Sequence, residues 1–192
     1  MSEYLSEGSK VIVAGCGTGS HSKFLVNSLE CELVNLDLSP EMLKIDRGKA
    51  EAEHIVATVE ELPFHDEVFD AVICSRAFYL FEDKNLFLRR AYSCLKKEGL
   101  LLVSTFSKGL WITRLLMTAG LLSPDPQLYP YNARDLSLML YQAGFNRVET
   151  RCVVLYTNGI SRFFPKFILA FTRRLENRLH DGRWVMAIGK KL

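Results

Sequence analysis

A glycine-rich loop, VIVAGCGTGS at residues 11–20, carries the clearest chemical signal in this chain. An apolar run breaks there into Gly15, Gly17 and Gly19, and glycines let the backbone approach a ligand closely. Asp37 follows Gly19 by eighteen residues and ends a second apolar run. Its carboxylate could accept hydrogen bonds from both hydroxyls of a ribose. A strand, a glycine loop, a helix and an acid at the next strand end indicate a nucleotide-binding site.

The spacing of the glycines discriminates between nucleotide ligands. Dinucleotide loops follow the pattern G-x-G-x-x-G, with the pyrophosphate over the helix N-terminus. This chain has G-x-G-x-G, and Ser20 stands where the third dinucleotide glycine would lie. Nicotinamide-dependent redox chemistry is therefore the least favoured of the functions considered.

Strand-like and helix-like segments alternate along the chain, which predicts a doubly wound α/β fold with a parallel sheet. Ser39 is expected to cap a helix that has Pro40 at its first position. The expected strands are 10–15, 31–37, 54–58, 69–76, 100–106, 146–158 and 183–191, and the expected helices are 21–29, 39–51, 85–99 (stopped at Gly99), 109–122 and 133–144.

The GCGTG loop resembles that of the class I S-adenosylmethionine-dependent methyltransferases, where it wraps the methionine end of the cofactor. The resemblance continues through NLDLSPEML (35–43), the stretch ATVEELPFHDEVFDAVICSRAFYLFED (57–83) and LKKEGLLLVSTF (95–106). These motifs look most like the branch that methylates small molecules, including quinone precursors. The resemblance implies S-adenosylmethionine as cofactor and S-adenosylhomocysteine as product.

The resemblance also implies the complete architecture. It predicts a Rossmann-like, mainly parallel seven-stranded sheet with an antiparallel terminal hairpin. Residues 1–192 would form a single methyltransferase domain. Its cofactor-binding half would be 9–106, and its substrate-side half would be 107–192 with a helical insertion at 159–182.

Cofactor-binding roles follow from the same resemblance. Asp37 would hold the ribose, Leu38 would lie beside the adenine, and Met42 would pack near the cofactor. The Thr58 hydroxyl could accept a hydrogen bond from the adenine amino group. The implied cofactor-binding residues are Gly15, Cys16, Gly17, Thr18, Gly19, Asp37, Leu38, Met42, Thr58, Val59, Glu60 and Ser75.

The sequence departs from the family at two acidic positions. Val13 stands where members commonly have an acid that organises the ammonium end of the cofactor, and Thr58 stands where they often have Asp. Binding could then be weaker, or could use backbone carbonyls and water. These departures leave open a non-catalytic binding or scaffold module on the same fold.

Methyl transfer from a sulfonium is an in-line displacement, so the protein mainly supplies orientation and desolvation, worth ~7–11 kcal/mol from proximity alone. Three catalytic candidates lie near the expected acceptor. Tyr79 could orient a nucleophile or be a packed aromatic, Arg76 could hold an acidic group or be an exposed arginine, and His21 could be a base or a solvated helix-start histidine. No His, Cys and Asp cluster has metal-ligand spacing.

Composition indicates one globular domain in the cytoplasm. The chain has 192 residues, 48% of them hydrophobic, without the ~20-residue apolar run of a membrane span. Its first residues are polar and acidic, unlike a signal peptide. The five cysteines are widely spaced with no C-x-x-C pair, which favours buried thiols in a reducing compartment.

The substrate side is basic and aromatic. Residues 146–192 carry ten Lys or Arg against three Asp or Glu, which could face an anionic substrate, nucleic acid or a membrane, or be a solvated face. Residues 107–132, with Trp111, could roof the cleft. Residues 159–182 could cap the site, form a homodimer interface, lie on a membrane or pack on the core.

Only about nine residues precede the first expected strand. The cleft could therefore be open and take a bulky substrate, or be covered by residues 107–132, a second subunit or a partner. A small-molecule acceptor is favoured over RNA or protein. An RNA methyltransferase using the basic C-terminal region remains an alternative, although CSRAFY (74–79) is not an Asn-Pro-Pro-Tyr-type motif.

Overall fold

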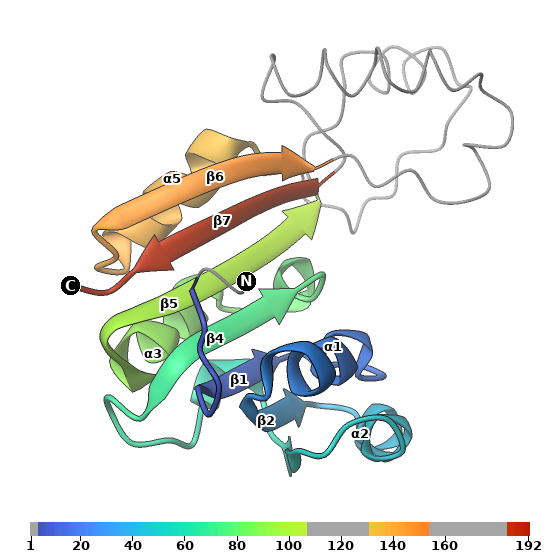
Figure 1. Cartoon of the computed structure of the whole chain (residues 1–192). Coiled ribbons are helices and arrows are strands. Elements are labelled where there is room, and N and C mark those ends of the chain that lie inside the picture. The colour runs from blue at the N-terminus through green and yellow to red at the C-terminus, as the bar shows by residue number, and fades with distance from the viewer. Residues whose placement is uncertain (1–3, 107–130, 154–183) are drawn as a thin grey trace, which may run out of the picture.

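The computed structural model describes residues 4–106, 131–153 and 184–192 (Figure 1). Several expectations from the sequence lie outside the described residues. These are the helix at 109–122, the aromatic roof at 107–132 apart from Tyr131 and Asn132, the helical insertion at 159–182, and the distal part of the strand at 146–158.

Seven strands form one sheet in the order β3-β2-β1-β4-β5-β7-β6. The first five are parallel, and β7 runs antiparallel between β5 and β6. This confirms the Rossmann-like sheet and its antiparallel terminal hairpin. The strands are β1 (Lys10–Ala14), β2 (Glu32–Asp37), β3 (Glu53–Val56), β4 (Phe69–Ser75), β5 (Leu95–Phe106), β6 (Arg147–Val153) and β7 (Trp184–Lys190).

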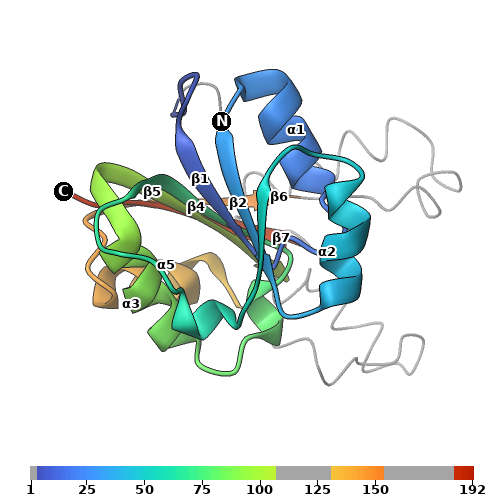
Figure 2. The ribbon, with the colours of Figure 1, turned by 90° about the horizontal axis from the view of Figure 1, so that it is seen from below.

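Helices cover both faces of the sheet. Figure 2 shows α1 (Ser20–Leu29) and α2 (Pro40–Arg47) on one side, with α3 (Lys84–Cys94) and α5 (Ala133–Gln142) on the other. Two 3-10 turns, η1 (Val59–Glu61) and η2 (Phe78–Leu80), complete the described elements. Each face has its own buried apolar cluster, which fixes the helices against the strands.

Local capping chemistry sets where the helices begin. The Ser39 hydroxyl accepts from the Met42 N–H at 3.2 Å, and Pro40 is the first residue of α2, as expected. Asp83 caps α3 by accepting from the Leu86 N–H at 2.8 Å. Asn132 forms a reciprocal capping box at the start of α5. Each cap satisfies backbone donors that have no partner inside the helix.

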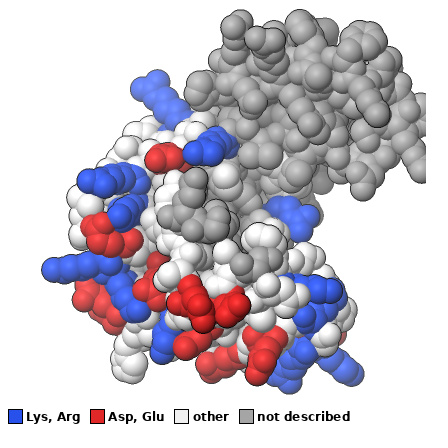
Figure 3. All heavy atoms as spheres, in the orientation of Figure 1, with Lys and Arg blue, Asp and Glu red and all other residues white. Residues whose placement is uncertain are grey.

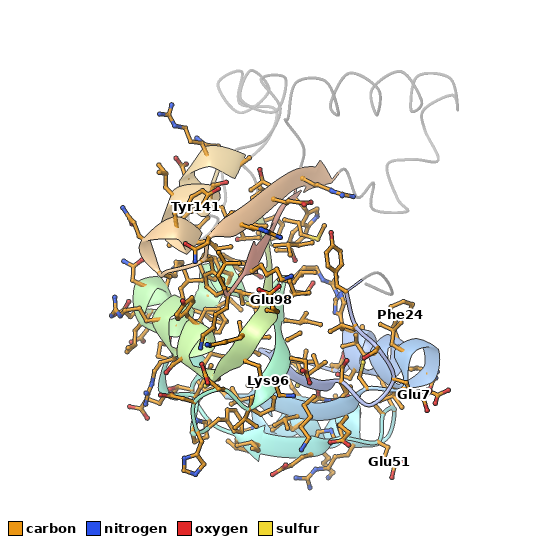
Figure 4. All side chains as sticks on the ribbon, turned by 60° about the vertical axis from the view of Figure 1, so that its left-hand side comes forward. Glu7, Phe24, Glu51, Lys96, Glu98 and Tyr141 are labelled. Carbon is orange, nitrogen blue, oxygen red and sulfur yellow. The ribbon has the colours of Figure 1, made fainter. Side chains whose placement is uncertain are left out.

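The expected helix at 85–99 is wrong at its C-terminal end. The helix α3 stops at Cys94, and β5 starts at Leu95, which pairs with Phe69 of β4. The buried Leu95 also accepts a hydrogen bond on its carbonyl from Lys191 Nζ at 2.7 Å. Glu98 has a φ of 65°, which no helix tolerates. Long-range pairing therefore overrides the helix-stop pattern at Gly99, and Lys96 and Glu98 lie along β5 (Figure 4).

The surface and the cysteines agree with a packed globular fold. On the face drawn in Figure 3, basic and acidic side chains are interspersed. The cysteines whose side chains are described (Cys16, Cys31, Cys74 and Cys94) are all buried free thiols. Within the described ranges, no helix has the length and apolar character needed to cross a membrane.

Candidate cofactor-binding site

The candidate site lies at the carboxyl ends of the parallel strands. The strand order reverses at β1, where the chain continues to β2 on one side and β4 lies on the other. Ligands of open α/β sheets bind outside the strand ends at such a point. The glycine loop follows β1 there, and Asp37 and Ser75 end the neighbouring strands β2 and β4.

Each glycine of the loop has a left-handed backbone, with φ of 67° at Gly15, 56° at Gly17 and 76° at Gly19. A Cβ on Gly15 would lie 2.5 Å from Ala77 Cβ, and one on Gly19 would lie 1.7 Å from Asp46 Oδ1. Close packing thus requires both of these glycines. A Cβ on Gly17 would meet no described atom within 4 Å, so this glycine borders open space that a ligand could enter.

Asp37 anchors the loop and keeps capacity to bind a ligand. Its Oδ2 accepts from the Gly17 N–H at 2.8 Å, and its Oδ1 accepts from the Ser39 N–H at 2.9 Å. The residue is half-buried. A carboxylate oxygen has two lone pairs, so each can accept one further hydrogen bond. Contact between Asp37 and a ribose stays a prediction that this geometry permits.

The residues next to Asp37 provide an apolar flank. The side chains of Leu38 and Met42 are 68% and 41% exposed, which is unusual for large apolar groups. They follow Asp37 at the carboxyl end of β2 and in the first turn of α2. Such a surface suits the face of a purine ring. The contact of Leu38 with the adenine and the packing of Met42 near the cofactor stay predictions.

The residues after β3 differ in what they can offer a ligand. Thr58 is half-buried and precedes η1, so its hydroxyl is a candidate for a polar contact. The Val59 side chain is buried in the core, which leaves only its backbone to face the site. Glu60 Oε1 accepts from the Glu82 N–H at 2.9 Å and ties η1 to the segment before α3.

Three side chains from separate elements meet at the ends of β4 and β5. Ser75 Oγ lies 3.2 Å from His21 Nε2 and 3.1 Å from Ser104 Oγ. The Arg76 N–H donates to Ser104 Oγ at 3.2 Å, which leaves the Ser104 hydroxyl proton for Ser75. Ser75 can then donate to Nε2 of His21. This chain of hydrogen bonds ends on a basic nitrogen.

The environment of His21 favours its neutral imidazole. Burial lowers the pKa of His21 from its ordinary value of 6.5, and the nearby Arg76 guanidinium lowers the pKa further. Arg76 itself is exposed and has a φ of 60°. A neutral imidazole at these strand ends can accept a proton.

Tyr79 lies at the same edge of the sheet. Its ring centroid is 4.9 Å from that of Phe106, which stacks on Trp184 at 4.1 Å. The half-buried Tyr79 is therefore a packed aromatic at the ends of β5 and β7. Its role toward an acceptor stays a prediction.

Cys16 is a neutral packing residue of the loop. Burial raises the pKa of its thiol, and the charges of Asp46 and Asp37 raise the pKa further. The thiolate is the reactive form of cysteine, so this environment suppresses its nucleophilicity. The thiol donates to the Gly17 carbonyl at 3.6 Å.

A buried polar cluster that no sequence pattern predicted lies beneath the loop. Asp46 of α2 is fully buried, receives a hydrogen bond from Asn35 Nδ2 at 2.5 Å and lies 3.2 Å from His54 Nε2. One signal was available, because Asp46 follows Leu43 by three residues and shares the buried face of α2.

The fold and the site together define a class I methyltransferase architecture. A family model described as a methyltransferase domain matches residues 12–103. A solved S-adenosylmethionine-dependent methyltransferase of Thermotoga maritima superposes with a TM-score of 0.69 at 19% identity, over 99% of this chain and 85% of that chain.

Two curated relatives specify the family further. A demethylmenaquinone methyltransferase of Tropheryma whipplei is 30% identical over 76% of this chain and 70% of its own length. The ubiquinone/menaquinone biosynthesis C-methyltransferase UbiE of Wigglesworthia glossinidia brevipalpis is 35% identical over 53% of this chain and 44% of its own. The chain belongs to the class I S-adenosylmethionine-dependent methyltransferase family. It spans less than two thirds of the length of several curated relatives that it matches.

Proposed function

We propose that this chain is an S-adenosylmethionine-dependent methyltransferase that acts in line on a small-molecule acceptor. One observation carries the proposal. Gly17 borders open space at the strand ends, and its N–H donates to Asp37, whose carboxylate retains acceptor capacity. The loop residues, Asp37 and the exposed Leu38 and Met42 fit the polar and apolar parts of this cofactor.

The cofactor would bring a methyl group already activated by the sulfonium. The protein would then have to bind and orient the cofactor and the acceptor, and to exclude water from the reacting groups. Gly15, Cys16, Gly17, Thr18 and Gly19 would hold the methionine end through the backbone. Asp37 would bind the ribose, and Leu38, Met42, Thr58, Val59 and Glu60 would surround the adenine. Ser75 would line the methyl-transfer side.

The acceptor proposed here carries a proton that must leave. His21 is neutral and within hydrogen-bonding distance of Ser75, so it can take such a proton from the acceptor directly or through the Ser75 hydroxyl. One curated relative is named a demethylmenaquinone methyltransferase, and the other a C-methyltransferase of ubiquinone and menaquinone biosynthesis. The quinol form of such a quinone, like a phenol, has such a proton. A small phenolic or quinol acceptor is the class that suits this arrangement.

The organisation of the whole chain is part of the proposal. Residues 1–192 would form one domain, with 9–106 binding the cofactor and 107–192 facing the acceptor. The described cysteines are free thiols, which supports a reducing compartment, and we place the protein in the cytoplasm.

Calorimetric titration with S-adenosylmethionine, S-adenosylhomocysteine and NAD tests the cofactor assignment. We expect micromolar binding of the first two ligands and none of NAD. An Asp37→Ala variant should lose this binding, while Asp70→Asn, at the opposite strand ends, should keep it. If the wild-type chain binds neither methyl-cycle ligand, the enzyme proposal fails and a binding or scaffold module replaces it.

A further inference from the structure

Residues at and just after the C-terminal end of α2 contact the glycine loop. Asp46 lies directly behind Gly19, since a Cβ on that glycine would come 1.7 Å from Asp46 Oδ1. Asp46 also raises the pKa of the Cys16 thiol, although burial raises it more. Three residues further on, Lys49 Nζ donates to the Thr18 carbonyl at 2.7 Å. Two side chains of opposite charge therefore contact the loop from one helix end.

The two oxygens of Asp46 have different surroundings. Oδ2 accepts from Asn35 Nδ2 and lies 3.2 Å from His54 Nε2. Oδ1 is buried and has no hydrogen-bond partner among the described residues. A buried carboxylate is costly unless paired, so an oxygen left without a partner requires an explanation.

The start of α1 supplies part of that explanation. The helix begins at Ser20, immediately after Gly19, and no described side chain caps it. The first N–H groups of a helix carry partial positive charge. A carboxylate held behind Gly19 stabilises this end of α1 electrostatically. It thereby fixes the backbone that must face a ligand.

The sheet beneath the loop places Val13 in the same row as this cluster. Val13 pairs laterally with Asn35, and Asn35 pairs with His54. Lateral neighbours in a sheet project to the same face, so all three side chains lie under α1 and α2. Val13 is the position at which this sequence lacks an acid, and the carboxylate instead comes from α2.

We propose that Asp46 is a positioning residue, which holds the glycine loop and the start of α1 in the cofactor-binding conformation. The hydrogen bond from Asn35 orients the Asp46 carboxylate, and its charge lies in the row where Val13 supplies none. This inference rests on the proposed function, because the conformation in question is the one that binds S-adenosylmethionine. No described contact requires Asp46 itself to touch the cofactor.

The test is calorimetric titration with S-adenosylhomocysteine, with the melting temperature of each ligand-free variant measured in parallel. Asp46→Asn keeps the size of the side chain and removes its charge. We expect this variant to bind about tenfold more weakly or worse. The matched control is Asp70→Asn, which removes a carboxylate held by Lys96 and the Lys10 N–H, and it should bind as the wild type does.

A transplanted carboxylate separates positioning from simple packing. The double variant Val13→Asp/Asp46→Asn returns a negative charge to the same row and should recover most of the affinity. Wild-type affinity in Asp46→Asn would overturn the inference. The inference would also be overturned if the double variant melted no lower than Asp46→Asn but recovered none of the affinity for S-adenosylhomocysteine.

A second readout covers a double variant that does not fold. Amide hydrogen exchange at Gly17, Gly19 and Ser20 should accelerate in Asp46→Asn relative to Asp70→Asn, and unchanged exchange would contradict a positioning role. Failure of the proposed function looks different, because the wild-type chain itself would then bind no S-adenosylhomocysteine.

Discussion

Two buried charged residues, Lys191 and Asp46, lie at opposite ends of the parallel strands, and their surroundings differ. Lys191 follows β7 at the amino ends of the parallel strands. Its Nζ donates to the Leu95 carbonyl at 2.7 Å, lies 3.4 Å from Glu67 Oε1 and sits 4.9 Å from the centre of the Tyr92 ring. Asp46 lies near the carboxyl ends, and its Oδ1 has no partner among the described residues.

The difference separates a structural charge from a functional one. Lys191 links the residues after β7 to the start of β5. Its ammonium group is paired with the Leu95 carbonyl, the Glu67 carboxylate and the Tyr92 ring. Asp46 is incompletely paired and lies behind the loop that borders open space. Stability favours complete pairing of buried charges, so the incomplete pairing of Asp46 agrees with its proposed role in positioning the loop.

Cavity size alone would place the ligand site at the wrong ends of the strands. A pocket of about 520 Å³ lies beside Lys191 and Tyr92, between charged side chains of both signs. It is at the amino ends of the parallel strands, where open α/β sheets do not bind their ligands. The glycine loop has the left-handed backbone and the free acceptor capacity that a nucleotide needs.

The largest effect is expected from Gly19→Ala. Its Cβ would collide with Asp46 Oδ1 at a left-handed φ of 76°, so we expect unfolding to become easier by about 3 kcal/mol or more. Gly17→Ala, at a similar φ but in open space, should cost only about 1–2 kcal/mol while abolishing cofactor binding. Chemical denaturation and S-adenosylhomocysteine titration of both variants measure the contrast.

A coupled variant sharpens that contrast. Gly19→Ala/Asp46→Ala removes the colliding oxygen and should be more stable than the sum of the two single changes predicts. Strict additivity would mean that Asp46 does not lie behind the loop.

The next effect concerns His21. His21→Asn retains a group that can bond Ser75 but cannot take up a proton, so methyl transfer to a phenolic acceptor should fall by about 10²–10⁴-fold. Binding of S-adenosylhomocysteine should change little. The measurement is the initial rate with a panel of phenol and hydroquinone acceptors, next to Ser75→Ala.

The pH profile adds a second measure of His21. The base must be neutral, and its pKa is lowered below 6.5 by burial and by Arg76. Activity should therefore persist as pH falls to 6.5 and decline only below it. A profile whose acid limb lies above pH 6.5, or is unchanged in His21→Asn, excludes His21 as the base.

The smallest effect on ligand binding is expected at Lys191. Lys191→Met leaves the Leu95 carbonyl without its donor and Glu67 without its cation, which should cost about 1–3 kcal/mol in the free energy of unfolding. The affinity for S-adenosylhomocysteine should stay as in the wild type. If this folded but less stable variant lost affinity, the distinction between the two ends of the strands would not hold.

Much of the fold follows from local sequence patterns. Short apolar runs and amphipathic segments predict the five parallel strands and their helices, and Ser39 and Pro40 predict the start of α2. The prediction fails at residues 95–99, because a helix-stop pattern is local while the pairing of Leu95 with Phe69 is not. Burial of Leu95 against a distant strand outweighs the local preference.

The sequence by itself determined the glycine loop, Asp37 and the family, since each depends on residues close together in the chain. Only the tertiary structure joined His21 to Ser75, fifty-four residues apart, and Asn35 to Asp46, eleven apart. An isolated Asp or His in a sequence is expected to be exposed to solvent, because water is its usual partner. Burial of Asp46 beneath the loop, which no local pattern encodes, gives that carboxylate its function.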